Sequence, residues 1–475
     1  MRYLQRTLFR NELADDSPAD WNAVINGGWC RRVSHNPNQA TPAGRRAIRR
    51  HRPWDAAHRR RGVQRARVFP PTYEYGDPAV GWVAAPPTGV IGEYGCVEYS
   101  SGVTYTYTRN EDGVRTLLSA HELVTDSQRY LIALTGDSQT DLCAPNAQTH
   151  AGVLERVLNA NGLRAAVLPY GAGRYSPLQD YLVFKKVLLK YHPDAFVLNF
   201  YTGNDFYDML RVDDRPHFVR TDSGYTLAPP VWYVYDSPGL LPHSRVLFAL
   251  RSFAKWAGLH GFVQRLRVLA ALASEQGKGL PTVLTYMNDL RKSRQASVGY
   301  GAALAAQMLN QQLFFHRFAE SRAEAIRRVR ALLQMVRREN PDLLLMLSPI
   351  PSYQLAQQQP VDDALLRTLA RLPITYEGGV QEERALYDSL RVLAREGGWL
   401  FVDNLRALRA YKGPDRLYNN FDYHLLPAAS EIIGRAQAQA LLQRAPTRRG
   451  SVRALARRTS GESARFVASQ LRERQ

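Results

Sequence analysis

The sequence predicts an α/β protein, a three-layer α/β/α sandwich around a five-stranded parallel sheet of the flavodoxin-like kind. Two observations lead to this prediction. From residue 130 onward, short apolar runs alternate with amphipathic helical stretches, and Asn340-Pro341 ends one of these stretches just where the next apolar run begins. Alternation of this kind favours parallel strands joined by right-handed crossovers, with helices on both faces of the sheet.

Each element of the sandwich has its own signal in the sequence. The apolar runs have the length of buried strands, and the stretches between them carry apolar residues at spacings of three and four. The expected strands are 131–135, 164–168, 195–200, 342–347 and 399–402. The expected helices are 147–160, 177–190, 320–338 and 381–395.

This domain is expected to span residues 129–442 and to carry two additions. Residues 71–128 are expected to form a small β-rich N-terminal extension, because 103–108 alternates with period two and is rich in Thr and Tyr. Residues 206–320 interrupt the strand–helix rhythm and are predicted to be a long, mostly helical insertion. Insertions of this length usually form a lid, a binding element or an interaction surface.

The net charge of +19 is concentrated in the two ends of the chain. Residues 1–70 contribute +10 and residues 444–475 contribute +7, which leaves about +2 for everything between them. Both ends, 1–70 and 443–475, are therefore expected to be basic, disordered tails. They predict weak contact with anionic surfaces at most, and no specific nucleic-acid partner.

Cys30, Cys96 and Cys143 are an odd number of cysteines without metal-ligand spacing, so neither a disulfide framework nor a zinc site is predicted. No stretch approaches the ~18 apolar residues that span a bilayer, and the N-terminus lacks the pattern of a signal peptide. As written, the chain is expected in the cytoplasm. The irregular composition of residues 1–70 leaves an alternative, a misassigned start and an exported or periplasmic protein.

Small and polar residues follow the predicted strands at their carboxyl ends, where open parallel sheets bind ligands. They are Gly136-Asp137-Ser138 after the first strand, Gly171-Ala172-Gly173-Arg174 after the second, Gly203-Asn204-Asp205 after the third, and Asp422-Tyr423-His424 at the head of the last helix.

These residue types suit acyl transfer from an ester. The hydroxyl of Ser138 becomes a nucleophile when a base within about 2.6–3.2 Å takes its proton, and an imidazole such as that of His424 titrates near neutral pH. Asp422 could orient that imidazole and stabilise its charged form. Candidate donors to an oxyanion are the backbone N–H of Ser138, a backbone N–H of the turn after the second strand, and the amide of Asn204.

At these motifs the chain resembles the SGNH hydrolases, also called the GDSL family, over roughly residues 129–442. The resemblance implies that Ser138 is the nucleophile and first oxyanion donor, that Asn204 is the third donor, and that Asp422 and His424 complete a triad. The family's usual Asp-x-x-His spacing is replaced by Asp-x-His, which looks like some members that act on polysaccharide acetyl groups. Where an Asn-x-Gly-x-x-Gly turn is common, this sequence has Pro169 and Arg174 at the outer positions. The second oxyanion donor is thus left open between Gly173 and Arg174.

Each signal alone also has a structural interpretation. Gly-Asp-Ser and Gly-Asn-Asp are typical of polar turns, His424 could be a surface histidine at a helix N-terminus, and Asp422 could be a helix cap. Asp403, just after the fifth strand, is a weaker competitor as the residue that orients the histidine. The remaining histidines occur singly and are interpreted as structural or surface residues.

The sequence therefore predicts a serine esterase that forms an acyl-serine intermediate without a metal or cofactor. Its expected substrate is an O-acetyl ester of a glycan or another small ester. Two alternatives remain. A polysaccharide O-acetyltransferase would use the same residues behind a covering insertion that excludes water. A catalytically inactive carbohydrate-binding module would account for the altered glycine turn. The acyl group, the alcohol and the oligomeric state are left open.

Overall fold

The computed structural model of the chain describes residues 74–84, 91–97, 103–212, 215–230, 319–357, 375–419 and 423–444. The predicted tail 1–70, nearly all of the tail 443–475 and residues 231–318 of the predicted insertion lie outside this part of the chain. None of the described helices is both long enough and apolar enough to cross a membrane.

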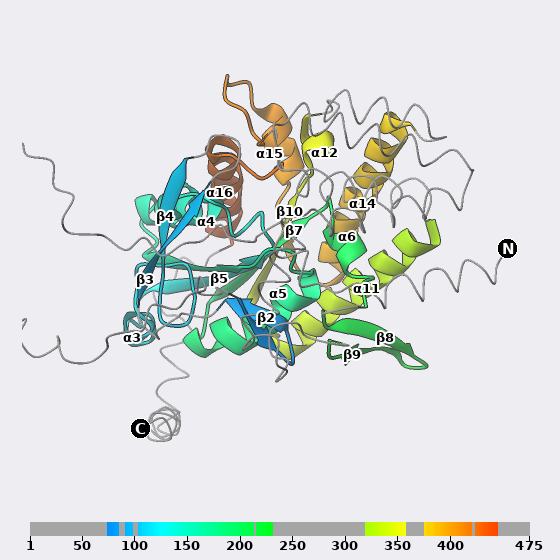
Figure 1. Cartoon of the computed structure of the whole chain (residues 1–475), viewed down its shortest axis with the longest axis horizontal. Helices are drawn as coiled ribbons and strands as arrows, with labels where there is room; N and C mark the ends of the chain where they lie inside the picture. Colours follow the sequence, from blue (N-terminus) through cyan, green and yellow to red (C-terminus); the bar gives the residue numbers. More distant parts are fainter. Residues whose placement is uncertain are drawn as a thin grey trace, which may run out of the picture.

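A five-stranded parallel sheet lies at the centre of the fold, with the strand order β11-β10-β7-β5-β6 (Figure 1). The strands are β5 (Tyr130–Gly136), β6 (Ala165–Gly171), β7 (Ala195–Tyr201), β10 (Leu344–Ile350) and β11 (Leu400–Phe401). Numbered along the chain, this order is 2-1-3-4-5, the doubly wound order of flavodoxin-like folds. The predicted fold class and all five predicted strands are confirmed.

Adjacent residues of β5 face opposite sides of the sheet, which explains why Leu131–Leu134 are all apolar. Ile132 and Leu134 pack against α4 (His150–Ala160) and α16 (Pro427–Leu442). Leu131 and Ala133 belong to the core on the other side, which α5 (Pro177–Val183), α11 (Ala319–Glu339) and α14 (Tyr376–Glu396) cover. Figure 1 shows these two helical layers on either side of the sheet.

The predicted helix over 177–190 is built from three consecutive helical geometries. α5 begins with a capping box between Ser176 and Gln179. It continues as the π-helical η2 (Phe184–Leu188) and the 3₁₀-helical η3 (Leu189–Tyr191), and ends at His192, whose φ is 51°. Shorter helices complete the described fold: α3 (Ala120–Thr125), η1 (Asn146–Gln148), α6 (Asp205–Asp208), α12 (Tyr353–Gln357) and α15 (Asn404–Ala410).

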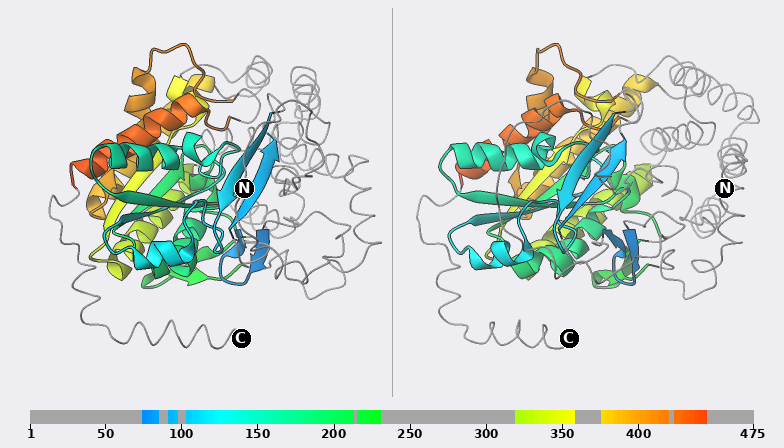
Figure 2. Two further views of the ribbon diagram at one scale, coloured as in Figure 1. Left: turned by 90° about the vertical axis from the view of Figure 1, so that its left-hand side faces the viewer. Right: turned by 60° about the vertical axis from the view of Figure 1, so that its left-hand side comes forward.

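Two antiparallel strand pairs precede the sheet: β1 (Glu74–Asp77) with β2 (Gly81–Ala84), and β3 (Gly92–Val97) with β4 (Thr104–Arg109). The strand predicted at 103–108 is confirmed as β4. Both views of Figure 2 show the two blue strand pairs along the same side of the sheet.

The described beginning of the 206–320 segment differs from the helical insertion that was expected. After α6 it forms a β-hairpin of β8 (His217–Thr221) and β9 (Gly224–Ala228). The turn needs a glycine, because Gly224 has a φ of +128° that side chains rarely adopt. The helical stretches expected further along the insertion lie outside the described residues.

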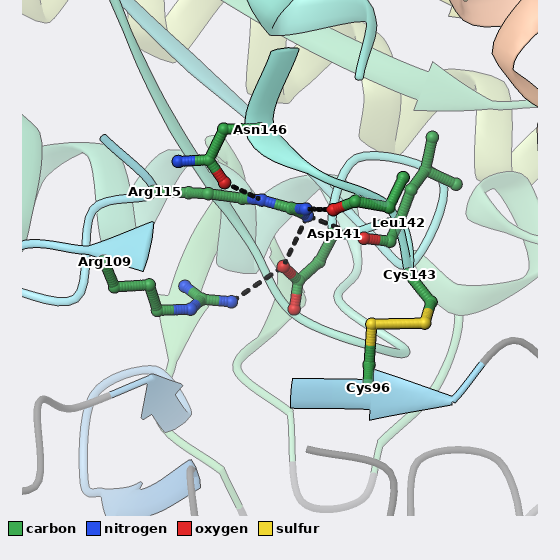
Figure 3. The surroundings of a disulfide bond; sticks show 8 residues. Cys96, Arg109, Arg115, Asp141, Leu142, Cys143 and Asn146 are labelled. Carbon is green, nitrogen blue, oxygen red and sulfur yellow. Dashed lines mark hydrogen bonds and ion pairs between the residues drawn. A yellow bond between two sulfur atoms is a disulfide. The ribbon is translucent and has the colours of Figure 1, made fainter. Parts of the chain in front are cut away.

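Cys96 and Cys143 form a disulfide, although the cysteine count predicted no disulfide framework (Figure 3). It joins β3 to the loop after β5, with the two Cα atoms 5.7 Å apart and a sequence separation of 47. An odd number of cysteines does not exclude a single bridge, and pairing at this separation depends on tertiary contacts that the sequence does not display.

Candidate active site

Ser138 lies in a tight turn directly after β5, between two buried neighbours. The backbone N–H groups of Gln139 and Thr140 donate to the side-chain and main-chain oxygens of Asp137, both at 2.9 Å. Asp137 and Gln139 are 3% and 2% exposed, whereas Ser138 is half-buried. The turn therefore anchors the residues on either side of the serine and leaves the serine itself accessible.

The segment that contains His424 is hydrogen-bonded to this turn by Gln139. Its side-chain amide donates to the carbonyl oxygen of Tyr423 at 3.2 Å and accepts from the N–H of Leu425 at 3.0 Å. Tyr423 adopts a left-handed conformation, with φ 59°, immediately before the histidine. The structure thus brings the predicted nucleophile loop and the predicted base, 286 positions apart, to the same edge of the sheet.

Asp137 interacts electrostatically with His424. Burial is the main influence on this carboxyl group and raises its pKa to about 6, and Asp208 adds to the rise. The backbone N–H of Gln139, the charge of His424 and the neighbouring amide of Asn204 act in the opposite direction. Asp137 therefore shares its surroundings with two of the predicted site residues.

The turn after β6 lies against the serine turn, because β5 and β6 pair with Gly136 opposite Gly171. A Cβ at Gly171 would lie 3.0 Å from the carbonyl oxygen of Gly136, so this close approach requires a glycine. Gly173 and Arg174 follow, both buried. Arg174 has a φ of 64°, a left-handed conformation in a position where the resembled family commonly has glycine.

The side chain of Arg174 is stacked on the N-terminal extension. Its guanidinium lies 5.1 Å from the ring centroid of Trp82, a fully buried residue of β2. Its carbonyl oxygen accepts hydrogen bonds from Arg215 at 3.1 and 3.2 Å. These contacts hold a conformation that costs a side-chain-bearing residue about 1–3 kcal/mol.

Asn204 lies at the carboxyl end of β7, immediately before α6. Its amide nitrogen donates to the carboxylate of Asp208 at 3.0 Å. A side-chain amide has two N–H donors, so this bond orients the group and uses one of them. Asn204 therefore lies at the same edge of the sheet as Ser138, as predicted.

Four buried carboxyl groups lie beneath this edge, on Asp137, Asp180, Asp205 and Asp208. Burial raises the pKa of Asp180 and Asp205 well above its ordinary value, and the charge of Asp137 raises both further. Arg211 and Arg215 lie 3.6 and 3.7 Å from Asp208. The raised pKa of Asp180 and Asp205 favours their neutral forms beneath this edge of the sheet.

The loop after Ser138 is held by two arginines from the N-terminal extension (Figure 3). Arg109 contacts Asp141 at 2.7 Å and Arg115 contacts it at 3.6 Å. The guanidinium of Arg115 also donates to the carbonyl oxygens of Leu142 and Ala144 and to Asn146. With the disulfide at Cys143, these bonds fix the loop to β3, β4 and the segment that follows them.

Asp422 and Asp403 are the two residues that the sequence suggests as partners of His424. Asp422 lies outside the described residues. Asp403 caps α15, accepting from the N–H of Arg406 at 3.2 Å, and pairs with Arg391 at 2.6 Å. Asp403 is thus engaged at its own helix, as a capping residue.

The sequence analysis missed several residues of this site. Gln139 and Asp137 flank the predicted nucleophile, yet their roles depend on contacts with the far end of the chain. Asp180 lies on a helix and is not at a strand end, so the search of strand ends did not include it. Among the described residues, no group of three or more His, Cys, Asp or Glu side chains is arranged to hold a metal ion.

Neither a protein-family model nor a curated protein matches this sequence. Several solved structures are similar in part. LAE5, an alpha/beta hydrolase enzyme from the metagenome of Lake Arreo, is 11% identical, with 66% of this chain and 94% of that chain covered and a TM-score of 0.30. The lipase/acylhydrolase from Enterococcus faecalis is 12% identical, with 66% and 96% covered and a TM-score of 0.29. Axe2, an acetylxylan esterase from Geobacillus stearothermophilus, is 12% identical, with 66% and 94% covered and a TM-score of 0.31. Similarity at this level carries no argument about the function of this chain.

Proposed function

We propose that this chain is a serine esterase in which Ser138 is the nucleophile and His424 is its general base. One observation carries the proposal: both sequence neighbours of Ser138 interact with the histidine segment. Asp137 does so electrostatically, and Gln139 does so through hydrogen bonds on either side of His424. We infer from these contacts that the Ser138 hydroxyl lies within reach of the His424 imidazole.

In the proposed reaction, the Oγ of Ser138 attacks the ester carbonyl while His424 accepts the hydroxyl proton. The tetrahedral oxyanion receives hydrogen bonds from the N–H of Ser138, from an N–H of Gly173 or Arg174, and from the Asn204 amide. His424 then gives its proton to the departing alkoxide, which leaves as the alcohol. Water, deprotonated by His424, attacks the acyl-serine. The bond between the acyl carbon and the Ser138 Oγ then breaks, His424 returns the proton to that Oγ, and the carboxylic acid leaves. Asp422 is proposed to orient the imidazole.

The proposed substrate is an O-acetyl ester of a glycan or another small ester. This choice depends on the Asp-x-His spacing at Asp422 and His424 and on the resemblance described above. The acetyltransferase alternative was motivated by the long insertion, most of which lies outside the described residues. No specific observation favours it, so hydrolysis is the reaction we propose.

The test is hydrolysis of p-nitrophenyl acetate together with labelling by a fluorophosphonate probe. Ser138→Ala and His424→Asn should each lower kcat by about 10³-fold or more, and Ser138→Ala should abolish labelling. Ser389→Ala is the control, because Ser389 lies on α14 and donates only to the carbonyl of its own helix at Leu386. Full activity or labelling in Ser138→Ala would refute the proposal.

A further inference from the structure

Gln139 connects the nucleophile loop to the two peptide groups that flank His424. Its Nε2 donates to Tyr423 on one side, and its Oε1 accepts from Leu425 on the other. The side chain is 2% exposed, so both bonds are shielded from water. A buried carboxamide in this arrangement fixes the position of the residue between its two partners.

The histidine segment needs such a connection. Tyr423 has a φ of 59°, which costs a residue with a side chain about 1–3 kcal/mol and persists only where surrounding contacts hold it. Asn419 supplies part of that support, since its N–H donates to the carbonyl of His424 at 2.8 Å and its carbonyl accepts from Tyr423 at 3.2 Å. Asn419, however, lies in the same stretch of chain as the histidine. Gln139 fixes the stretch to the loop of Ser138.

We propose that Gln139 is a positioning residue that sets the placement of the His424 imidazole relative to the Ser138 hydroxyl. This inference rests on the proposed function. The carboxamide is suited to the task because it supplies one donor and one acceptor at once, which neither a carboxylate nor an apolar side chain of the same length does. A displacement of about 1 Å between reacting groups can lower a rate by about 10²-fold.

The first test compares kcat and KM in Gln139→Met, which keeps the length of the side chain and removes both hydrogen bonds. We expect kcat to fall about 10- to 100-fold, with KM changed by less than about threefold. A residue that only stabilises the fold would lower the melting temperature and leave the kcat of the folded protein unchanged. Unchanged kcat in Gln139→Met therefore overturns the inference.

A matched control exists at the opposite edge of the sheet. The amide of Asn159 donates to the carbonyl of Ala165 at 3.0 Å and accepts from its N–H at 3.2 Å, where β6 begins. Asn159→Leu removes this pair of bonds, together with the bond from the same amide to the carbonyl of Glu155, far from the carboxyl ends of the strands. We expect it to lower stability and to leave kcat as in the wild type. An equal loss of kcat in both variants would show a general effect on the sheet and overturn the inference.

A second readout does not depend on activity. NMR titration of the His424 ring, assigned by the signal lost in His424→Asn, should differ from wild type in Gln139→Glu and Gln139→Met. The added carboxylate of Gln139→Glu should raise the pH at which the ring loses its proton. The Asn159→Leu spectrum should match wild type, and a His424 titration unaltered by either Gln139 variant overturns the inference. If Ser138 is not labelled and the wild type hydrolyses no ester, the proposed function fails, and this titration still decides whether Gln139 holds the imidazole.

Discussion

Arg109 of β4 donates to Asp141 at 2.7 Å, and the two side chains are only 7% and 22% exposed. Asp141 follows Ser138 by three positions, and Arg115 shares the same carboxylate at 3.6 Å. One acid thus compensates two largely buried cations that come from outside the parallel sheet. The N-terminal extension is thereby coupled to the loop that contains the proposed nucleophile.

Removing the charge of Asp141 should be costly. In Asp141→Asn, two buried guanidinium groups lose their counter-charge, and we expect the free energy of unfolding to fall by about 3 kcal/mol. Glu396→Gln is the control, because Glu396 pairs with Arg330 where both side chains are 43% exposed. That pair should contribute less than about 1 kcal/mol. Urea denaturation measures both, and equal losses would contradict the coupling.

The disulfide should contribute mainly by restricting the unfolded chain. Closing the loop between Cys96 and Cys143, whose sequence separation is 47, is expected to stabilise the fold by about 4 kcal/mol. The double variant Cys96→Ser, Cys143→Ser should therefore unfold at lower urea concentration than the oxidised wild type. Dithiothreitol should lower the stability of the wild type and leave that of the double variant unchanged. A wild type unaffected by the reductant would contradict the prediction.

Asp137→Asn should stabilise the protein at neutral pH and have little effect in acid. The pKa of Asp137 in the folded state, about 6, lies above its ordinary value of 3.8. The neutral Asp137 carboxyl group thus makes its full contribution to the free energy of unfolding below pH 4. This contribution is lost as the pH rises to about 6. Asparagine stays neutral and still accepts from the N–H of Gln139, so the gain above pH 6 should reach up to about 3 kcal/mol. Denaturant unfolding at pH 4 and pH 8 measures the difference in the free energy of unfolding between the variant and the wild type. The same difference at both pH values would disprove the prediction.

His150 should change the pH dependence of stability in the opposite direction to Asp137. It is fully buried, and burial lowers its pKa from 6.5 to about 4, with a smaller contribution from Arg115. Its contribution to stability is therefore present above pH 6.5 and is lost as the pH falls towards 4. In His150→Gln an amide oxygen can replace the Nε2 that lies 2.9 Å from the Asn199 amide. We expect this variant to lose less stability than the wild type between pH 7 and pH 4. Parallel pH profiles of the two proteins would contradict this.

The sheet could be predicted from the sequence because a buried parallel strand is recognisable as a local run of apolar residues. All seven residues of β6 are buried, as are six of the seven in β7, and the two runs are apolar apart from Asn199 in β7. The right-handed crossover rule then leaves few arrangements, and the observed order is one of them. The same reasoning places the residues after each strand at one edge, where the structure has Ser138, Arg174 and Asn204.

Contacts between distant segments could not be predicted in this way. The partners of Gln139 lie at Tyr423 and Leu425, and nothing near residue 139 identifies them. The Cys96–Cys143 bridge likewise depends on how β3 lies against the loop after β5. Arg174 is an intermediate case, because the sequence showed a side chain where glycine is common, and the structure shows the left-handed backbone that results.

The last helix of the described residues, α16, packs so closely on α4 that a Cβ at Gly434 would lie 2.6 Å from the carbonyl oxygen of His150. This close fit has a consequence during synthesis. A ribosome adds about 5–20 residues per second, so roughly 15 to 60 seconds separate the emergence of β5 from that of α16. During that interval Leu134 and its neighbours on that face of the sheet lack the second of the two helices that cover them. Under the proposed mechanism, the imidazole also arrives last, so an unfinished chain hydrolyses nothing.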